Sequence, residues 1–279
     1  MLAAALWGLF TARVHPAGAD REGRERDVRE LAQVTSALFN AGRFADAYAP
    51  SLKLHELQPR NQVLVMRLGD IAQRLGKWED EARWREEYMR LSPAPEEACP
   101  RIGLAYGELG RHREEVASFQ RCLSFAPTDP DMHYYLGHAH ERAGDSAAAA
   151  ASYQKGLILA PDNIDLSLGL GRVDLRRGDP KAALALARKA LEKSPRNADA
   201  LLVLGMAELR LDHPDAARAA LLLGAEIRGG DADLQLVLGI AEERLGHRAL
   251  ALGRYNRALE LRPDEADALT RKRRLEASK

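Results

Sequence analysis

Residues 130–163 have the sequence PDMHYYLGHAHERAGDSAAAAASYQKGLILAPDN, and units of this length follow one another seven times without a gap from Val28 to Glu265. In this unit, apolar residues at helical spacing lie on both sides of Gly144, which predicts two short helices joined by a tight turn. Glycine at that point can take the left-handed conformation that ends a helix without a side-chain clash. Pro161 ends the second helix, and the polar residues after it can cap the helix that follows.

The 34-residue period is carried by glycines and prolines. Turn glycines recur at Gly42, Gly76, Gly110, Gly144, Gly178 and Gly246. A second series recurs inside the first predicted helix of each unit at Gly69, Gly103, Gly137, Gly171, Gly205 and Gly239. A strict period of this length indicates stacked units that cannot bury their apolar faces alone, so we expect an open array of repeats. Glycine inside a helix costs about 1 kcal/mol relative to alanine, and we expect close approach of Ala149 to explain Gly137.

The units resemble the tetratricopeptide repeat, a helix-turn-helix unit of 34 residues. Leu136-Gly137 and Ala149 match the family's seventh, eighth and twentieth positions. The repeats span residues 28–61, 62–95, 96–129, 130–163, 164–197, 198–231 and 232–265. The resemblance implies an all-α fold, a right-handed α-solenoid or superhelix of antiparallel helix pairs. Repeat six departs from the pattern, because Asp212 replaces the turn glycine and Gly229 replaces the closing proline.

The segments outside the repeats have a different character. Residues 1–19 contain the apolar run Leu2–Phe10 and the small-residue site Ala17-Gly18-Ala19, which together predict a signal peptide or an N-terminal membrane anchor. No Lys or Arg precedes the apolar run, so a fraying or capping helix is the alternative. We expect residues 20–27 to form a linker and residues 266–279 a C-terminal capping helix and tail. The protein is accordingly predicted to be exported or anchored in a bacterial envelope, with the cytoplasm as the alternative location.

Composition argues against several classes of function. Lys and Arg total 41 residues and Asp and Glu also total 41, so no overall field attracts nucleic acid or an acidic membrane surface. The basic run Arg271-Lys272-Arg273-Arg274 is expected to be solvated at the C-terminal end of the last helix, where cations are favourable. No nucleophile, metalloprotease or phosphate-binding motif is present. The sequence therefore predicts a chain that is not an enzyme and holds no cofactor.

Histidines and cysteines do not form a predicted metal site. His133 and His140 occupy core positions of the first helix of repeat four while His138 faces elsewhere, so the three do not converge on one face. Cys99 and Cys122 both lie in repeat three, on facing sides of its two predicted helices. A disulfide between them is sterically conceivable, and two buried free thiols are the favoured interpretation.

The resemblance also implies a ligand-binding surface. In the family, a concave groove is lined by positions two, five, six, nine, twelve and thirteen of each first helix. The candidate peptide-binding residues in repeats four to seven are Tyr134, Tyr135, His138, Arg142, Leu168, Arg172, Leu175, Arg176, Leu202, Met206, Leu209, Arg210, Leu236, Ile240 and Arg244.

Apolar and basic candidates suggest what this groove binds. The helix around Leu201–Met206 is apolar on every face, which implies burial beyond its core side. We expect a groove for an amphipathic helix or an extended peptide, with packing against neighbouring repeats or the C-terminal helix as the alternative. Arginine at position thirteen suits pairing with ligand carboxylates, although basic residues are also expected near the end of each first helix. These arginines are Arg74, Arg142, Arg176, Arg210 and Arg244.

The sequence thus predicts a non-catalytic protein–protein interaction scaffold that binds a peptide or helix in the groove of repeats four to seven. Exported members of the family suggest a role in envelope assembly or secretion. Two alternatives are a structural, self-associating subunit that forms a homo-oligomer through its apolar C-terminal surface, and a regulatory subunit of a membrane-bound enzyme anchored by residues 1–19. Some family members grip acidic chaperone tails through Lys and Asn positions, and repeats one to three keep only Arg101 of that pattern.

Overall fold

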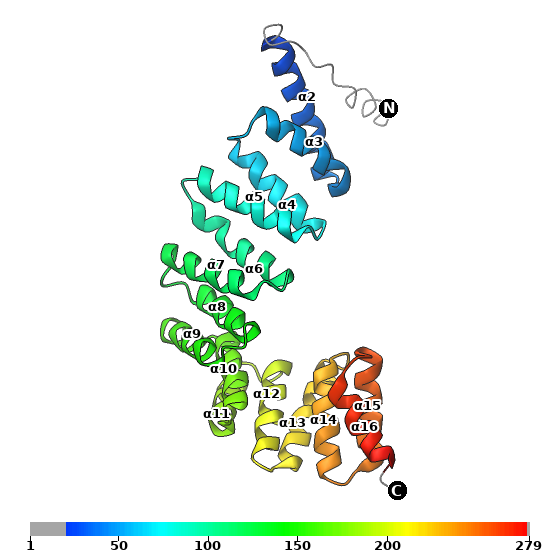
Figure 1. Cartoon of the computed structure of the whole chain (residues 1–279). Coiled ribbons are helices and arrows are strands. Elements are labelled where there is room, and N and C mark those ends of the chain that lie inside the picture. The colour runs from blue at the N-terminus through cyan, green and yellow to red at the C-terminus, as the bar shows by residue number, and fades with distance from the viewer. Residues whose placement is uncertain (1–20, 278–279) are drawn as a thin grey trace. The chain divides into compact units, whose positions relative to one another are not determined.

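The computed structural model describes residues 21–277, which are organised in helices and contain no strand within that range. The chain forms two compact units, one ending at Arg111 and the other beginning at His112. Each unit is a stack of helices in chain order (Figure 1). Between Arg21 and Ala277 no helix combines the length and the apolar character needed to cross a bilayer. The predicted signal peptide or anchor at residues 1–19 lies outside the described residues.

Unit one contains two complete helix pairs and the first helix of a third. Neighbouring helices in the chain pack against each other, and the short 3₁₀ helix η1 contacts the helices on both sides of it. Residues 20–27, predicted as a linker, are helical from Arg21 onward, because α2 begins before the first repeat and continues into it. The elements are α2 (Arg21–Asn40), α3 (Phe44–Leu57), α4 (Gln62–Arg74), α5 (Trp78–Leu91), η1 (Pro95–Glu97) and α6 (Cys99–Glu108).

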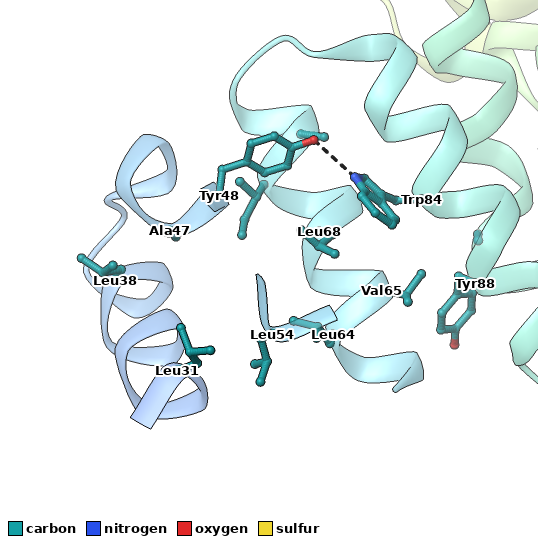
Figure 2. Packing of buried hydrophobic residues seen from close by; sticks show 13 residues of the cluster. Leu31, Leu38, Ala47, Tyr48, Leu54, Leu64, Val65, Leu68, Trp84 and Tyr88 are labelled. Atoms are coloured by element: carbon teal, nitrogen blue, oxygen red, sulfur yellow. Dashed lines mark hydrogen bonds between the residues drawn. The ribbon is translucent and has the colours of Figure 1, made fainter. Parts of the chain in front are cut away.

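The core of unit one collects large side chains from four helices. Leu31 of α2, Leu54 of α3 and Leu68 of α4 belong to one buried cluster, to which α5 contributes Trp84. Trp84 donates its indole N–H to the hydroxyl of Tyr48 at 3.3 Å, which satisfies a polar group inside an apolar core (Figure 2).

Unit two contains the second helix of repeat three, four complete helix pairs and a terminal helix. Each helix packs against the next, and α8, α10, α12 and α14 also contact one another in series. We call the surface formed by these four helices the first-helix face. The elements are α7 (His112–Phe125), α8 (Pro130–Arg142), α9 (Ser146–Leu159), α10 (Ile164–Arg177), α11 (Pro180–Lys193), α12 (Ala198–Arg210), α13 (Pro214–Ile227), α14 (Ala232–Arg244), α15 (Arg248–Leu261) and α16 (Ala266–Ala277).

Local sequence explains where these helices start and stop. Asn163 and Asn197 accept hydrogen bonds from backbone N–H groups in the first turns of α10 and α12, as expected of N-caps. Each predicted turn glycine has a positive φ, for example +80° at Gly144. In repeat six, Asp212 takes the same left-handed conformation with φ of 62°, so the turn is kept although its glycine is missing.

Repeat four requires a glycine inside its first helix for a different reason from the one expected. A Cβ added to Gly137 would lie 2.5 Å from Cε1 of Tyr153, so the absent side chain makes room for the tyrosine ring rather than for Ala149. A Cβ at Gly169 would meet the same ring at 2.7 Å. The ring of Tyr153, which comes from α9, is therefore enclosed by the backbones of α8 and α10.

Second helices differ in what they bury. Those of repeats four and seven bury Tyr153 and Tyr255 completely. In α11 of repeat five, the buried residues are all alanines: Ala183, Ala187 and Ala190.

The cysteines differ from expectation. Cys99 at the start of α6 and Cys122 in α7 are both buried, as predicted. The interpretation as two free thiols is wrong, because each cysteine is disulfide-bonded.

Candidate functional site

An aromatic surface lies on α8 of the first-helix face. Tyr134, Tyr135 and His138 are each partly exposed there. The ring of Tyr134 lies 6.2 Å from that of His138 and 5.7 Å from that of Tyr135, measured between centroids. Tyr135 also stacks on Phe119 of α7 at 5.5 Å. Helix α8 therefore presents a cluster of amphipathic rings on this face.

Four apolar candidates are buried. Leu168 and Leu175 of α10 pack against α11 and α12, where Ala187 and Val203 lie in the same cluster. Leu209 packs in the core between α12, α13 and α14. Leu236 packs against α15 and α16. Packing against neighbouring helices, the alternative weighed from the sequence, therefore accounts for these four residues.

Three further apolar candidates lie at the edge of the cores. Leu202, Met206 and Ile240 are partly buried and pack against the cluster that contains Leu221 and Leu238. At α12 and α14, the exposed portions of these three side chains are the part of the predicted apolar groove that remains accessible on the first-helix face.

Most arginines of the position-thirteen series have partners inside the chain. Arg142 forms a bidentate pair with buried Glu115, in which its Nε lies 3.1 Å from Oε2. Arg176 pairs with Glu141 at 2.9 Å. Arg244 donates to the carbonyl of Leu209 at 2.6 Å. Internal pairing explains these three without a ligand. The remaining two are Arg74, which lies over the ring of Phe44 in unit one, and Arg210, which is exposed.

Arg172 differs from that series. It lies on α10 at position nine of repeat five and is partly exposed. No hydrogen bond or ion pair holds its guanidinium within the described part of the chain. Its helix packs against α8, and its charge acts to lower the pKa of both Tyr134 and His138. The structure thus joins Arg172 to the predicted aromatic residues of α8.

Burial controls the ionisation of the histidines of α8. It lowers the pKa of His133, His138 and His140, so all three imidazoles are neutral near pH 7. At His138 the charge of Glu141 opposes the downward pKa shift, whereas Arg172 adds to it. Within residues 21–277, no group of three or more His, Cys, Asp or Glu side chains could hold a metal ion.

Tyr153 is the residue that the sequence analysis missed. Its side chain is fully buried, and its hydroxyl has no hydrogen-bond partner among the described residues. The charges that act on this phenol come from Glu141, Arg172 and Arg176, all on first helices. A signal for it exists in the sequence, because a tyrosine at position 24 accompanies a glutamate at position 12 in repeats four and seven, as Tyr153 with Glu141 and Tyr255 with Glu243.

Unit one offers a separate recess on α4. It has a volume of about 380 Å³, and Val63 at its margin is 70% exposed. Arg67 on its wall donates to the Ser36 hydroxyl at 2.8 Å and lies over the ring of Phe39. None of the predicted groove residues lines this recess.

Comparison with known proteins identifies the fold. The tetratricopeptide repeat model matches residues 101–164 and 168–233. A thermophilic TPR protein of Thermus thermophilus is similar in structure, with 23% identity, a TM-score of 0.57 and coverage of 65% of this chain and 98% of its own. A TPR protein of Parabacteroides merdae covers 90% of this chain and 99% of its own at 14% identity and a TM-score of 0.73.

A third similar structure is YrrB, described as a TPR protein with an unusual peptide-binding site. It has 20% identity and a TM-score of 0.50, and the match covers 69% of this chain and 99% of YrrB. No curated protein matches the sequence.

Paired helices, glycine turns and these matches define an all-α solenoid repeat protein. The family model and these structures support a tetratricopeptide repeat protein, as its repeats predicted. This fold supports a protein–protein interaction scaffold, and proteins that carry it are generally not catalytic.

Proposed function

We propose that the chain is a non-catalytic scaffold that binds a peptide or a helix along the first-helix face of unit two, at α8 and α10. The observation that carries the proposal is the aromatic surface of Tyr134, Tyr135 and His138 beside Arg172, which has no ion pair within residues 21–277. Tyrosine and arginine are enriched at protein interfaces because each combines a large contact area with directional hydrogen bonds. YrrB, which has a similar fold, is described as having a peptide-binding site, and this supports a peptide-like ligand.

The proposed site lies nearer the middle of the chain than the apolar pattern suggested. Leu168, Leu175, Leu209 and Leu236 are at most 9% exposed, so they contribute to the cores rather than to a ligand surface. Leu236 is also covered by α15 and α16, which leaves less apolar surface for self-association. A scaffold of this kind is expected to stay monomeric, and light scattering over a range of concentrations measures this directly.

A role in envelope assembly or secretion is part of the proposal. It is supported by the apolar run and the small-residue site in residues 1–19. The mature N-terminus, determined by mass spectrometry on protein from a fractionated bacterial host, tests it. Cleavage before Asp20 supports export, and an intact N-terminus in the cytoplasmic fraction contradicts it.

Peptide selection tests the binding site. Short random peptides displayed on phage would be selected against the full chain, and the enriched peptides measured against variants by fluorescence anisotropy. We expect Tyr134→Ala with His138→Ala to weaken binding at least tenfold. Leu250→Ala, which removes an exposed leucine on α15, is the matched control and should leave the affinity unchanged.

A second variant locates the ligand if Tyr134→Ala with His138→Ala leaves the peptide affinity unchanged. Met206→Glu with Ile240→Glu changes the first-helix face at α12 and α14. Loss of binding only in this variant would place the ligand on the C-terminal repeats and contradict the proposed site. Each variant must retain the helical circular dichroism and the melting temperature of the wild type.

A further inference from the structure

The chain contains the same tyrosine and glutamate pair twice, three repeats apart. Tyr153 and Glu141 occupy positions 24 and 12 of repeat four, and Tyr255 and Glu243 occupy the same positions of repeat seven. Both tyrosines are fully buried, and each ring fills the space left by a glycine of the preceding first helix. The two pairs therefore start from the same local geometry.

In repeat seven the polar groups of this pair are satisfied. The hydroxyl of Tyr255 donates to Oε2 of Glu243 at 2.5 Å. Helix α16 supplies two guanidinium groups to the same carboxylate: Arg271 lies 3.4 Å from Oε2, and Arg274 donates to Oε1. The basic run predicted to be solvated thus contributes two side chains that close this network. We call this arrangement the closed copy.

In repeat four the same groups are left incomplete. Oε1 of Glu141 lies 2.9 Å from the guanidinium of Arg176 but accepts no hydrogen bond, and the hydroxyl of Tyr153 is buried without a partner in the described part of the chain. Arg172 occupies position nine of repeat five. If α16 is numbered as the first helix of a next repeat that starts at Ala266, Arg274 occupies the same position. Arg172 has no ion pair within the described residues. We call this arrangement the open copy.

Charge balance in the open copy calls for an additional anion. Arg176 neutralises Glu141, which leaves the charge of Arg172 without a counterpart, among residues 21–277, beside the phenol of Tyr153. A buried hydroxyl that has given up water normally gains an internal acceptor, and none of the described residues accepts a hydrogen bond from this one. One carboxylate placed between Arg172 and Tyr153 would satisfy both donors, as Glu243 does for Arg274 and Tyr255 in the closed copy.

We propose that the open copy is a subsite for the carboxylate of an acidic side chain in the bound peptide. Arg172 donates to this carboxylate first, because its side chain is only partly buried whereas Tyr153 is fully buried. Tyr153 becomes the second donor when the neighbouring ring of Tyr134, 6.1 Å away between centroids, moves aside. This inference rests on the proposed peptide-binding function and adds the chemistry that the ligand must carry at one position.

The test uses peptides selected on phage against the full chain. An enriched peptide that contains Asp or Glu would be synthesised with both ends blocked, together with a version in which that residue is replaced by Asn or Gln. Removing the acid is expected to weaken binding to the wild type about tenfold or more, the range for a charge-assisted hydrogen bond. Arg172→Gln should weaken the acidic peptide to a similar degree and should bind both peptides equally. Arg196→Gln, an exposed arginine outside the face, is the control.

A tyrosine comparison separates binding from folding. Tyr153→Phe removes a buried hydroxyl that has no partner within the described chain, so the melting temperature should be unchanged or higher while the acidic peptide binds several-fold more weakly. Tyr255→Phe removes a hydroxyl that donates to Glu243, so the melting temperature should fall while peptide affinity is kept. If Tyr153→Phe loses stability as Tyr255→Phe does, its hydroxyl has an internal partner and the subsite is overturned.

Failure of the subsite differs from failure of the scaffold. The subsite would be overturned if peptides that bind through Tyr134 and His138 kept their affinity after loss of the acid. It would also be overturned if they bound Arg172→Gln as well as the wild type. Either result would leave the scaffold function standing. Peptides that need a free C-terminal carboxylate would also overturn it, because the blocked peptide would not bind. Selection that enriches no peptide would overturn both proposals.

Discussion

Repeat four and repeat seven have the same buried tyrosine and the same glutamate, yet only repeat seven completes the hydrogen bonds between them. The difference lies in the next first helix. In α16, Arg271 and Arg274 at positions six and nine both reach Glu243. In α10, position six is Gly169, and the two arginines whose charges act on Tyr153, Arg172 and Arg176, are at positions nine and thirteen. Arginine spacing in the following helix therefore decides whether this polar network is closed within the chain or left open to a ligand.

The largest effect is expected from removing the tyrosines altogether. Tyr255→Ala should lower the free energy of unfolding by about 3–5 kcal/mol, because it removes a fully buried ring and the donor to Glu243. Tyr153→Ala should cost less, since its hydroxyl has no partner in the described structure. Urea denaturation of both variants measures the difference. Equal losses would mean that the two copies are energetically the same.

The glycine beside each ring provides the next test. A Cβ at Gly137 would lie 2.5 Å from the ring of Tyr153, and one at Gly239 would lie 2.6 Å from that of Tyr255. Gly137→Ala and Gly239→Ala should each destabilise the fold by about 1–3 kcal/mol through overpacking. At Gly253 in α15, an added Cβ would meet no described atom within 4 Å apart from its chain neighbours and the backbone of its own helix. Gly253→Ala should therefore stabilise the fold by about 1 kcal/mol. Thermal denaturation shows whether each variant melts below or above the wild type.

The closed copy should also show a dependence on pH. Burial would raise the pKa of Glu243, but hydrogen bonds from Tyr255 and Arg274 lower it overall. A carboxyl with a depressed pKa in the folded state contributes stability above its unfolded pKa of about 4.3, and that contribution is lost as the pH falls through the folded value. Arg274→Gln should therefore cost about 1 kcal/mol or less at pH 7, since Arg274 is largely exposed.

The same variant should lose its effect in acid. As the pH falls below about 4.3, the urea midpoints of wild type and Arg274→Gln are expected to approach each other, because Glu243 is protonated in more of the molecules. A difference that stays constant as the pH falls through the range in which Glu243 titrates would show that Arg274 acts through packing rather than through the carboxylate.

The smallest effect is expected at the turn of repeat six. Asp212 holds a left-handed φ of 62°, which most residues other than glycine adopt at a cost. Asp212→Gly should stabilise the fold by about 0.5 kcal/mol after the greater flexibility of the unfolded glycine chain is subtracted. Its carboxylate lies 3.6 Å from Arg244 and is 92% exposed, so the lost ion pair contributes little. A lower melting temperature would contradict this reasoning.

The fold followed from the sequence because its signals are local. A turn glycine and a cap such as Asn163 act within a few residues of themselves, so the helix pairs could be predicted one repeat at a time. The binding surface depends on which face of each helix is covered by its neighbours. Leu168 and Leu236 have groove positions in the repeat but are buried by α12 and α16 respectively, and no local pattern shows this.

The open copy was missed for a related reason. Arg172 and Tyr134 were among the predicted groove residues, but the hydroxyl of Tyr153 becomes relevant only once its ring is seen to pass between α8 and α10. The matching repeat positions of Tyr153 and Tyr255 were present in the sequence and could have drawn attention to both.

Helix α11, whose buried residues are all alanines, has a consequence for the motions of the chain. Alanine buries little apolar area, so local opening of this helix uncovers less surface than opening of α9 or α15, each of which buries a tyrosine. Backbone amides of α11 should exchange with deuterium earlier than those of its two counterparts. Because α11 packs directly on α10, the helix that carries Arg172, a helix without a buried aromatic side chain lies next to the open copy and is expected to let it adjust to what binds there.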